Sequence, residues 1–527
     1  MGNFGLILDN VRLWNLIVLL GIALGTRILP RLFCIEARGM DAYYHLFAAG
    51  RIRENAFRFP HTLEAFLLPG IYDYPPFFHY LLAFFPKSWH LEIERWVSAV
   101  CDALHGLVVY IFSIYCLREA HFVQDPTSIA LWVTVLFLLS PALTYIGTGP
   151  RAYQGTPRTL GELFFMLCIS CSTIYFFQEG FIFLLGASFF GGLLLLTSKF
   201  GAQVFILFYL IFLFWFREAT WMMVLLTSFL VAWLFSWGHY KDILLGHLEH
   251  CQYYSKAISH RFYMVKDKNQ WANLTNLFKE FSRAPSKAAR IILTDNTYIL
   301  LLLKNPQLVY LLFLFLCTKP TYSTISIFLF VWIAAGVLVF FLTSLKPLLF
   351  LGEADRYLEY ALFPQLLLIT VLGNPFPFFY WLAGYEILLY GVFIAGFIHQ
   401  YSQKAKDLPE FKEMVAFIRS EKSIQRILPI YLEEANRLVY ESGKGIAHFP
   451  GNFRERFFPL QEFLFFYDKV YPFPNKNLRM LMERYRYDVV YFSQQDILKA
   501  QEYSVKYEFK DWEILFANAK YKVLKPL

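Results

Sequence analysis

Residues 322–343 read YSTISIFLFVWIAAGVLVFFLT, and none of them is charged. An apolar run of about 20 residues is long enough to cross the hydrocarbon core of a bilayer as an α-helix. Further runs of this kind occur along the chain, so the sequence predicts about eleven transmembrane helices in a mostly α-helical membrane domain. The other runs lie at 12–33, 96–117, 127–147, 160–178, 181–198, 202–216, 220–237, 299–317, 358–373 and 377–398.

The composition points the same way. Of the 527 residues, 57% are hydrophobic, 20% are aromatic and 17% are charged. Soluble domains carry roughly 25% charged residues, so much of the apolar surface of this chain is expected to face lipid. The formal net charge of +8 suits an anionic lipid surface or a phosphate-bearing substrate. The sequence has no basic low-complexity block, so we expect no nucleic-acid partner.

Long and short connections alternate between the predicted spans. With an odd number of spans, the long connections and the tail lie on one side of the membrane and the N-terminus lies on the other. Lysine and arginine in short loops favour the cytoplasm, and this places the N-terminus inside. We therefore expect a multi-pass protein of a bacterial or archaeal plasma membrane, with the long connections 34–95, 238–298 and 344–357 and the tail outside.

The tail has a different, more charged composition. We place a domain boundary between 1–401, the membrane domain, and 402–527, a small α/β extracytoplasmic domain that folds as a unit. Pro429 removes a backbone donor, so the strand that contains it is predicted to lie at a sheet edge. The expected elements are helices at 410–419 and 478–486, strands at 426–432 and 488–492, and a hairpin formed by 512–516 and 521–524.

The first long connection contains a candidate functional group. Asp41, Tyr44 and His45 follow the first span closely. If a helix begins near Asp41, its carboxylate caps that helix, and the two aromatic residues fall on the same face one turn later. Capping alone would explain Asp41 but not the crowding of Tyr44 and His45 at the membrane surface. Further along, Asp73 precedes the rigid pair Pro75–Pro76, where it either serves a site or caps a turn.

Cationic residues occur at the ends of later spans. Arg151 and Arg158 lie in a loop rich in Gly and Pro before a predicted helix, and both the start of a helix and arginine suit phosphate. Lys199 lies at the end of another span, where lysines often only anchor the helix. A third stretch carries Glu353, Arg356 and Tyr357 at the mouth of a span, where charged groups are costly unless they are paired or used.

Asp102 and His105 lie one turn apart inside the second predicted span. Ionisable groups within a span are candidates for function. We favour the alternative for Asp102, a polar lock between two helices.

Three motifs give the sequence a family resemblance. Residues 39–45, GMDAYYH, resemble the acidic first-loop position of the GT-C superfamily of integral membrane glycosyltransferases. Residues 72–76, YDYPP, look like the downstream aromatic-proline segment of that loop. Residues 353–357, EADRY, resemble the late external motif that ends in Arg-Tyr. The layout is similar to that of oligosaccharyltransferase catalytic subunits.

The resemblance implies a polyprenyl-phosphate or polyprenyl-diphosphate sugar as donor, and a glycan, lipid or protein as acceptor. Asp41 would be the general base or would orient the acceptor, and Glu353 would contact the sugar or a metal. Arg356, with Arg158 or Arg151, would hold the leaving phosphate. Tyr44, His45, Asp73, Lys199 and Tyr357 would contribute to substrate binding. The loop after the third span lacks the paired acids of oligosaccharyltransferases, so a divalent metal is possible but not expected.

Two other classes of function compete with an enzyme. A lipid-linked glycan flippase predicts repeated halves and acids near the bilayer midplane, whereas most candidate acids lie in the long connections. A non-catalytic membrane scaffold would leave the grouping of Asp41, Arg158 and Arg356 unexplained.

Overall fold

The computed structural model describes most of the chain. The described residues are 12–34, 38–68, 71–121, 125–144, 154–262, 270–290, 297–317, 323–352, 354–373, 375–405, 408–431, 434–448 and 451–527.

The chain forms two compact units, each built from discontinuous segments. We call them the helical unit (Met1–Ile35, Arg95–Tyr240 and Asn269–Ile398) and the mixed unit (Glu36–Glu94, Lys241–Lys268 and His399–Leu527). The tail predicted from residue 402 therefore lies in the same unit as the first long connection and part of the second.

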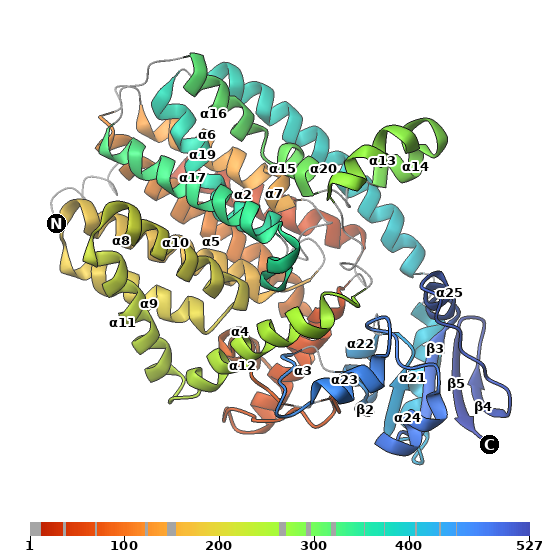
Figure 1. The fold of residues 1–527 in the computed structure, drawn as a ribbon. Helices are drawn as coiled ribbons and strands as arrows, with labels where there is room; N and C mark the ends of the chain where they lie inside the picture. The colour runs from red at the N-terminus through yellow and green to blue at the C-terminus, as the bar shows by residue number, and fades with distance from the viewer. Residues whose placement is uncertain are drawn as a thin grey trace. The chain divides into compact units, whose positions relative to one another are not determined.

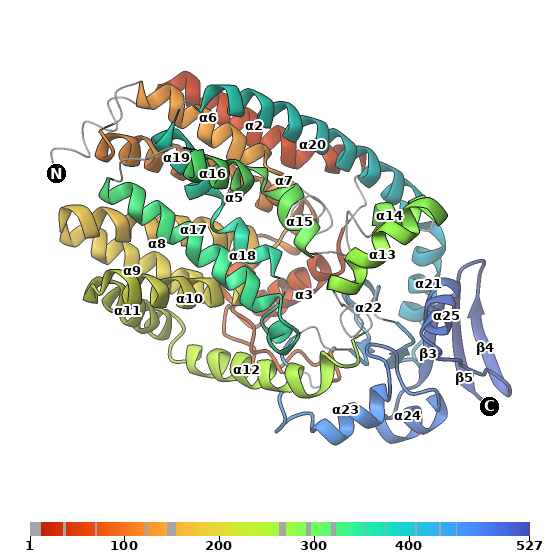
Figure 2. The same cartoon turned by 45° about the horizontal axis from the view of Figure 1, so that its top comes forward.

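The helical unit is a bundle in which α8 to α11 lie side by side (Figure 1), and α2 runs beside α6 (Figure 2). Its elements are α2 (Leu13–Phe33), α5 (His90–Glu119), α6 (Pro126–Leu139), α7 (Pro141–Thr144), α8 (Pro157–Gln178), α9 (Phe181–Leu195), α10 (Lys199–Phe216), α11 (Ala219–Phe235), α13 (Gln270–Arg283), α14 (Pro285–Arg290), α15 (Thr297–Lys304), α16 (Pro306–Cys317), α17 (Thr324–Thr343), η5 (Lys346–Leu351), α18 (Asp355–Glu359), α19 (Leu362–Leu372) and α20 (Phe376–Ala405). Helix α5 begins, and α20 ends, in the mixed unit.

Every predicted span coincides with an apolar helix or helix pair. Among the described residues, seven helices are long and apolar enough to cross a membrane, or up to nine if each of two bent pairs is one span. One bent pair is α15 with α16; the other joins α11 to the segment that follows it. The remaining predicted spans correspond to α9 and α19, which are apolar but shorter. The predicted mostly α-helical, multi-span architecture is confirmed.

The mixed unit contains a five-stranded sheet in the order β2-β1-β3-β5-β4. The first three strands are parallel, and β5 pairs antiparallel with both β3 and β4. Its elements are α3 (Met40–Glu54), α4 (Phe77–Ala83), η1 (Lys87–Trp89), α12 (Tyr240–Tyr253), η3 (Tyr254–Ile258), α21 (Leu408–Ser420), β1 (Arg426–Pro429), α22 (Ala435–Ser442), β2 (Gly445–Ile446), α23 (Leu460–Tyr467), α24 (Leu478–Tyr485), β3 (Val489–Ser493), α25 (Gln494–Glu502), β4 (Trp512–Ala517) and β5 (Tyr521–Pro526).

The sheet confirms the predicted hairpin, β4–β5, and corrects the prediction for Pro429. Strand β1 is not at the edge but lies between β2 and β3. Pro429 is its last residue, and β2 pairs only with Arg426 and Ile427. The missing proline donor therefore faces no β2 partner, and an inner strand tolerates it.

The first connection and the tail share one hydrophobic core. The backbone N–H of Leu67 donates to the carbonyl of Ile446 at 3.0 Å, and the N–H of Ile446 donates to the carbonyl of Ala65 at 2.8 Å. Residues of α3, α21, α22, β3 and β5 fill the same cluster of buried side chains. The first connection and the tail therefore fold together as parts of the mixed unit.

Candidate functional site

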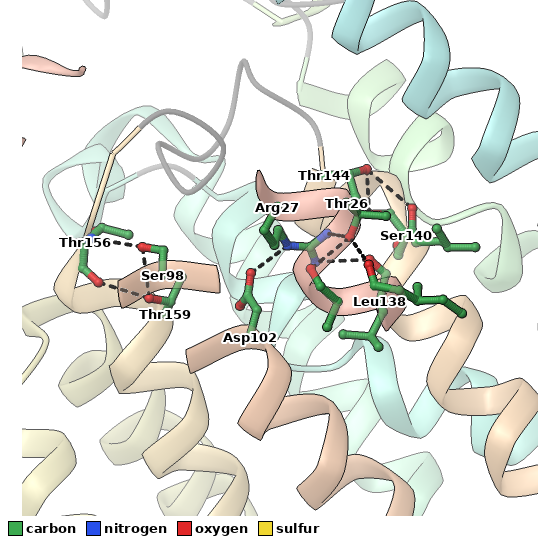
Figure 3. A network of polar contacts seen from close by, with 12 residues as sticks. Thr26, Arg27, Ser98, Asp102, Leu138, Ser140, Thr144, Thr156 and Thr159 are labelled. Carbon is green, nitrogen blue, oxygen red and sulfur yellow. Dashed lines mark hydrogen bonds and ion pairs between the residues drawn. The ribbon is translucent and has the colours of Figure 1, made fainter. Parts of the chain in front are cut away.

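The predicted site residues fall into two groups, one in each unit. In the helical unit the first group begins at the start of α8. Thr156 caps this helix by accepting from the N–H of Arg158 at 3.3 Å, and Pro157 occupies the first helical position. The N–H of Thr156 donates to the hydroxyl of Ser98 on α5 at 3.1 Å (Figure 3). The first turn of α8 is therefore fixed against α5.

Arg158 projects from this first turn into a buried set of carboxylates. Its Nη2 lies 2.5 Å from Oε2 of Glu359 on α18, and its Nε lies 3.3 Å from Oε1 of Glu162 one turn along α8. All three side chains are almost fully buried. Arg158 thus ties α8 to α18, and its charge is balanced within the protein.

Helix α10 begins beside α8. Ser198 caps α10 by accepting from the N–H of Gly201 at 3.1 Å. A Cβ on Gly161 would come within 2.7 Å of the Cβ of Ser198, so only glycine allows the two helix starts to approach this closely. Lys199 is the first residue of α10. Each helix start carries a partial positive charge of about half an elementary charge.

Helix α18 packs against the start of α10. The hydroxyl of Tyr357 donates to Oε1 of Gln203 and to the carbonyl of Leu351, both at 2.9 Å, and the Tyr357 ring lies 4.5 Å from that of Phe200. Tyr357 is fully buried, so these contacts give it a packing role. Its neighbour Arg356 is partly exposed. Arg158, Lys199 and Arg356 therefore come from three segments that meet where α8 and α10 begin.

Two predicted members of this group, Arg151 and Glu353, lie outside the described residues. The interior of the helical unit also holds Lys304, whose Nζ lies 2.6 Å from Oδ2 of Asp355 on α18. Both groups are buried, and the pair fixes α18 to the end of α15.

Asp102 forms the polar lock that the sequence favoured. Arg27 of α2 donates through Nε to Oδ2 of Asp102 on α5 at 2.7 Å, and the two side chains are fully buried (Figure 3). Arg27 also donates to the carbonyl of Leu138 and to the hydroxyl of Thr26, both at 3.0 Å. The guanidinium of Arg27 links α2, α5 and α6. Its pairing with Asp102 neutralises two charges that would be costly if they were unpaired within a membrane span.

Among the described residues, Asp102, His105 and Glu162 could hold a metal ion, because their ligand atoms all lie within 4.8 Å of one another. His105 and Glu162 also line a small cavity together with Glu359 and Tyr360. A mixed nitrogen and oxygen set suits a transition metal. However, arginines already pair with both carboxylates of the trio, and an ion would compete with those pairs.

The second group lies at the start of α3 in the mixed unit. The helix begins at Met40 with Gly39 as its N-cap, so the capping role considered for Asp41 is wrong. Asp41 lies one residue into the helix, where the dipole favours a carboxylate, and its side chain is exposed. Just before it, Nε of Arg38 lies 3.2 Å from Oε2 of Glu94, and both side chains are buried.

Tyr44 and His45 are packed inside the mixed unit. Nδ1 of His45 lies 2.7 Å from Nε2 of His79, and Nδ1 of His79 forms a hydrogen bond with the hydroxyl of Tyr72. Burial lowers the pKa of His45 to about 3, and burial also lowers that of His79. Both rings are therefore neutral near pH 7. This position gives Tyr44 and His45 a role in the core.

Asp73 is buried beside Arg454 of the tail. Its Oδ2 lies 3.8 Å from Nη1 of Arg454. Arg454 also donates two hydrogen bonds to the carboxylate of Glu249 on α12, from Nε to Oε2 at 2.7 Å and from Nη2 to Oε1 at 3.0 Å. A Cβ on Gly246 would come within 2.3 Å of Oδ2 of Asp73, so α12 packs directly on this carboxylate. Asp73 therefore joins three segments of the mixed unit.

The sequence interpretation missed Arg27, Glu359 and Arg454 as partners. Arg27 carried a usable signal, since an arginine inside an apolar span requires a nearby acid. Glu359 follows Arg356 by one helical turn and could have been considered with it. Arg454 lies in a charged tail, where no local pattern marks it as buried.

The comparisons with known proteins rest on structure. No protein family matches the sequence, and no curated protein is a detectable relative. The archaeal oligosaccharyltransferase AglB from Archaeoglobus fulgidus, solved with an inhibitory peptide and a dolichol-phosphate, superposes with a TM-score of 0.50 at 11% identity. The match covers 94% of this chain and 71% of AglB.

ArnT from Cupriavidus metallidurans, solved bound to undecaprenyl phosphate and in the apo state, matches with a TM-score of 0.45 at 11% identity. That match covers 96% of this chain and 97% of ArnT. The match with AglB shows that the chain has a GT-C-like fold, and a small α/β region lies near its C-terminus.

Proposed function

We propose that this protein is a membrane glycosyltransferase that moves a sugar from a polyprenyl-phosphate or polyprenyl-diphosphate donor to an acceptor on the extracytoplasmic face. The observation that carries the proposal is the meeting of Arg158, Lys199 and Arg356 at the starts of α8 and α10. Two helix starts with Lys199 and Arg356 beside them, and Arg158 tying α8 to α18, suit a phosphate at the membrane surface.

The chemistry is a displacement at the anomeric carbon. An acceptor hydroxyl or amide attacks this carbon, the bond from the carbon to the phosphate oxygen breaks, and the phosphate leaves on its lipid. The acceptor loses a proton to a general base. In this proposal Asp41 is that base, because its carboxylate is exposed while the following residues of α3 are buried.

Arg356 and Lys199 stabilise the negative charge that develops on the leaving phosphate. Arg158 forms ion pairs with Glu162 and Glu359 and so fixes the start of α8 against α18. Glu353 would contact the sugar. The long connections and the tail lie outside a bacterial or archaeal plasma membrane, where lipid-linked donors need no nucleotide.

The deciding experiment is a transfer assay. Purified protein in lipid nanodiscs is incubated with a panel of radiolabelled polyprenyl-phosphate sugars and with glycan, lipid and peptide acceptors. We expect transfer with one donor class, and Asp41→Asn should abolish it while the protein remains folded, because asparagine cannot take a proton. Near-normal turnover of Asp41→Asn would remove Asp41 from the mechanism, and no transfer from any donor would contradict the proposed function.

A further inference from the structure

Helix α22 of the tail lies along α3, the helix that carries Asp41. Its third residue is Arg437, whose side chain is 15% exposed. The guanidinium carbon lies 4.4 Å from the ring centre of Phe411 and 5.6 Å from that of Tyr43, and Nε lies 2.7 Å from Oε1 of Glu441. A planar guanidinium can stack flat on rings while it pairs with a carboxylate, whereas an ammonium group is a point charge with no plane to stack.

Tyr43 connects this arginine to the first turn of α3. It lies two residues after Asp41, it is buried, and its ring lies 5.8 Å from that of Tyr440 on α22. Arg38, which is paired with Glu94, is a second cation close to the Tyr43 hydroxyl. Burial raises the pKa of Tyr43, whereas Arg437 and Arg38 oppose the rise, so both cations act on this hydroxyl.

The start of α3 depends on these contacts. Gly39, the N-cap residue, supplies no side-chain oxygen to the free N–H groups of the first turn. Glycine is a somewhat weaker N-cap than serine or aspartate, because it offers these N–H groups no side-chain acceptor. The turn is therefore held by Arg38 before it and by Tyr43 after it, and Arg437 supports Tyr43.

We infer that Arg437 is a positioning residue that fixes the first turn of α3, and with it the carboxylate of Asp41, so that the tail is part of the catalytic apparatus. This inference rests on the proposed function for the role of Asp41. The mechanical link itself, from Arg437 through Tyr43 to the start of α3, is independent of any activity.

The test compares Arg437→Ala with Arg484→Ala in the full chain. Arg484 is a matched control, because it also stacks on a ring, that of Phe465 at 4.3 Å, and pairs with a glutamate of the tail, Glu462. It lies on α24, and its side chain is 47% exposed. Hydrogen–deuterium exchange of residues 38–47 reports the first turn of α3, and steady-state transfer gives kcat and the KM for donor.

Arg437→Ala should raise exchange in 38–47 at least tenfold and lower kcat by about 10- to 100-fold, the cost of a misplaced catalytic group. The KM for donor should stay unchanged, and Arg484→Ala should alter neither quantity. If Arg437→Ala does not fold, Arg437→Lys is used. It keeps the charge and the pair with Glu441 but loses the stacking geometry, so a smaller change of the same sign is expected.

Two outcomes overturn the inference: unchanged exchange in 38–47, or raised exchange with unchanged kcat. Failure of the proposed function gives a different result. If the wild-type protein transfers no sugar while Arg437→Ala still raises exchange in 38–47, the link from tail to first loop stands and only the assignment of Asp41 to catalysis falls.

Discussion

Replacing Arg454 with methionine tests whether Asp73 is structural or binds substrate. Methionine has a similar length and no charge, so the variant removes the guanidinium that lies 3.8 Å from the Asp73 carboxylate. The side chain of Asp73 is 3% exposed and that of Arg454 is 2% exposed, whereas the Glu249 side chain is 35% exposed. Water can replace Arg454 at Glu249 but not at Asp73.

Removing one partner of a buried ion pair costs about 3–5 kcal/mol, whereas a partly exposed pair contributes about 0–1 kcal/mol. Most of the loss therefore comes from Asp73. At about 2–4 °C for each kcal/mol in a unit of this size, the midpoint of unfolding should fall by roughly 10 °C. Adding Asp73→Asn to Arg454→Met should recover much of this loss, because the buried charge is then gone.

The assay follows unfolding of the mixed unit by alkylation of Cys251, a buried thiol on α12 that is in no disulfide, in the full chain during a temperature ramp. Arg456→Met is the control, because Arg456 lies two residues away, is exposed and stacks on Phe457 at 4.4 Å. If Arg454→Met unfolds no earlier than this control, the structural reading of Asp73 is refuted. Loss of transfer by Asp73→Asn with an unchanged midpoint would instead make Asp73 a substrate ligand.

Three further predictions concern the leaving phosphate, metal dependence and pH. Arg356→Lys should lower turnover by about two to three decades, because one lost phosphate contact costs about 2–4 kcal/mol. Arg151→Lys should lower turnover less. Equal effects of the two substitutions in the transfer assay would contradict this ranking. Transfer should survive chelation of divalent metals, because arginines pair with Asp102 and Glu162, and loss of activity restored by one metal would show otherwise. Burial raises the pKa of Glu434 to about 7, so the folded state holds this proton more tightly than the unfolded state. The stability this gives is full below the unfolded pKa and is lost as the pH rises through about 7. Glu434→Gln should therefore flatten the fall in the free energy of unfolding between pH 5 and 7.5 by at most about 3 kcal/mol, and an unchanged pH profile would refute the shift.

Much of the architecture follows from consecutive residues. The length and polarity of runs such as 322–343 predict membrane spans. In lipid the backbone N–H and C=O groups must form hydrogen bonds within the protein, and an apolar run of this length does so as an α-helix. The two short, mainly apolar runs 512–516 and 521–524, which flank residues 517–520, likewise predict the hairpin of β4 and β5. The sequence leaves a capping role and a functional role open for Asp41, and the helix start at Met40 removes the capping role. Sequence patterns locate a helix start only to within one or two residues.

The sequence alone determined that this chain crosses a membrane many times and carries charges where lipid would not accept them unpaired. The tertiary structure alone decided the pairing. Arg27 pairs with Asp102, which is 75 residues away in the sequence, and Arg158 pairs with Glu359, which is 201 residues away. Hydropathy is a property of neighbours along the chain, whereas the partner of a buried charge is set by which helices pack together. For the same reason Asp41 is exposed and Asp73 is buried, although both are acids in the same connection.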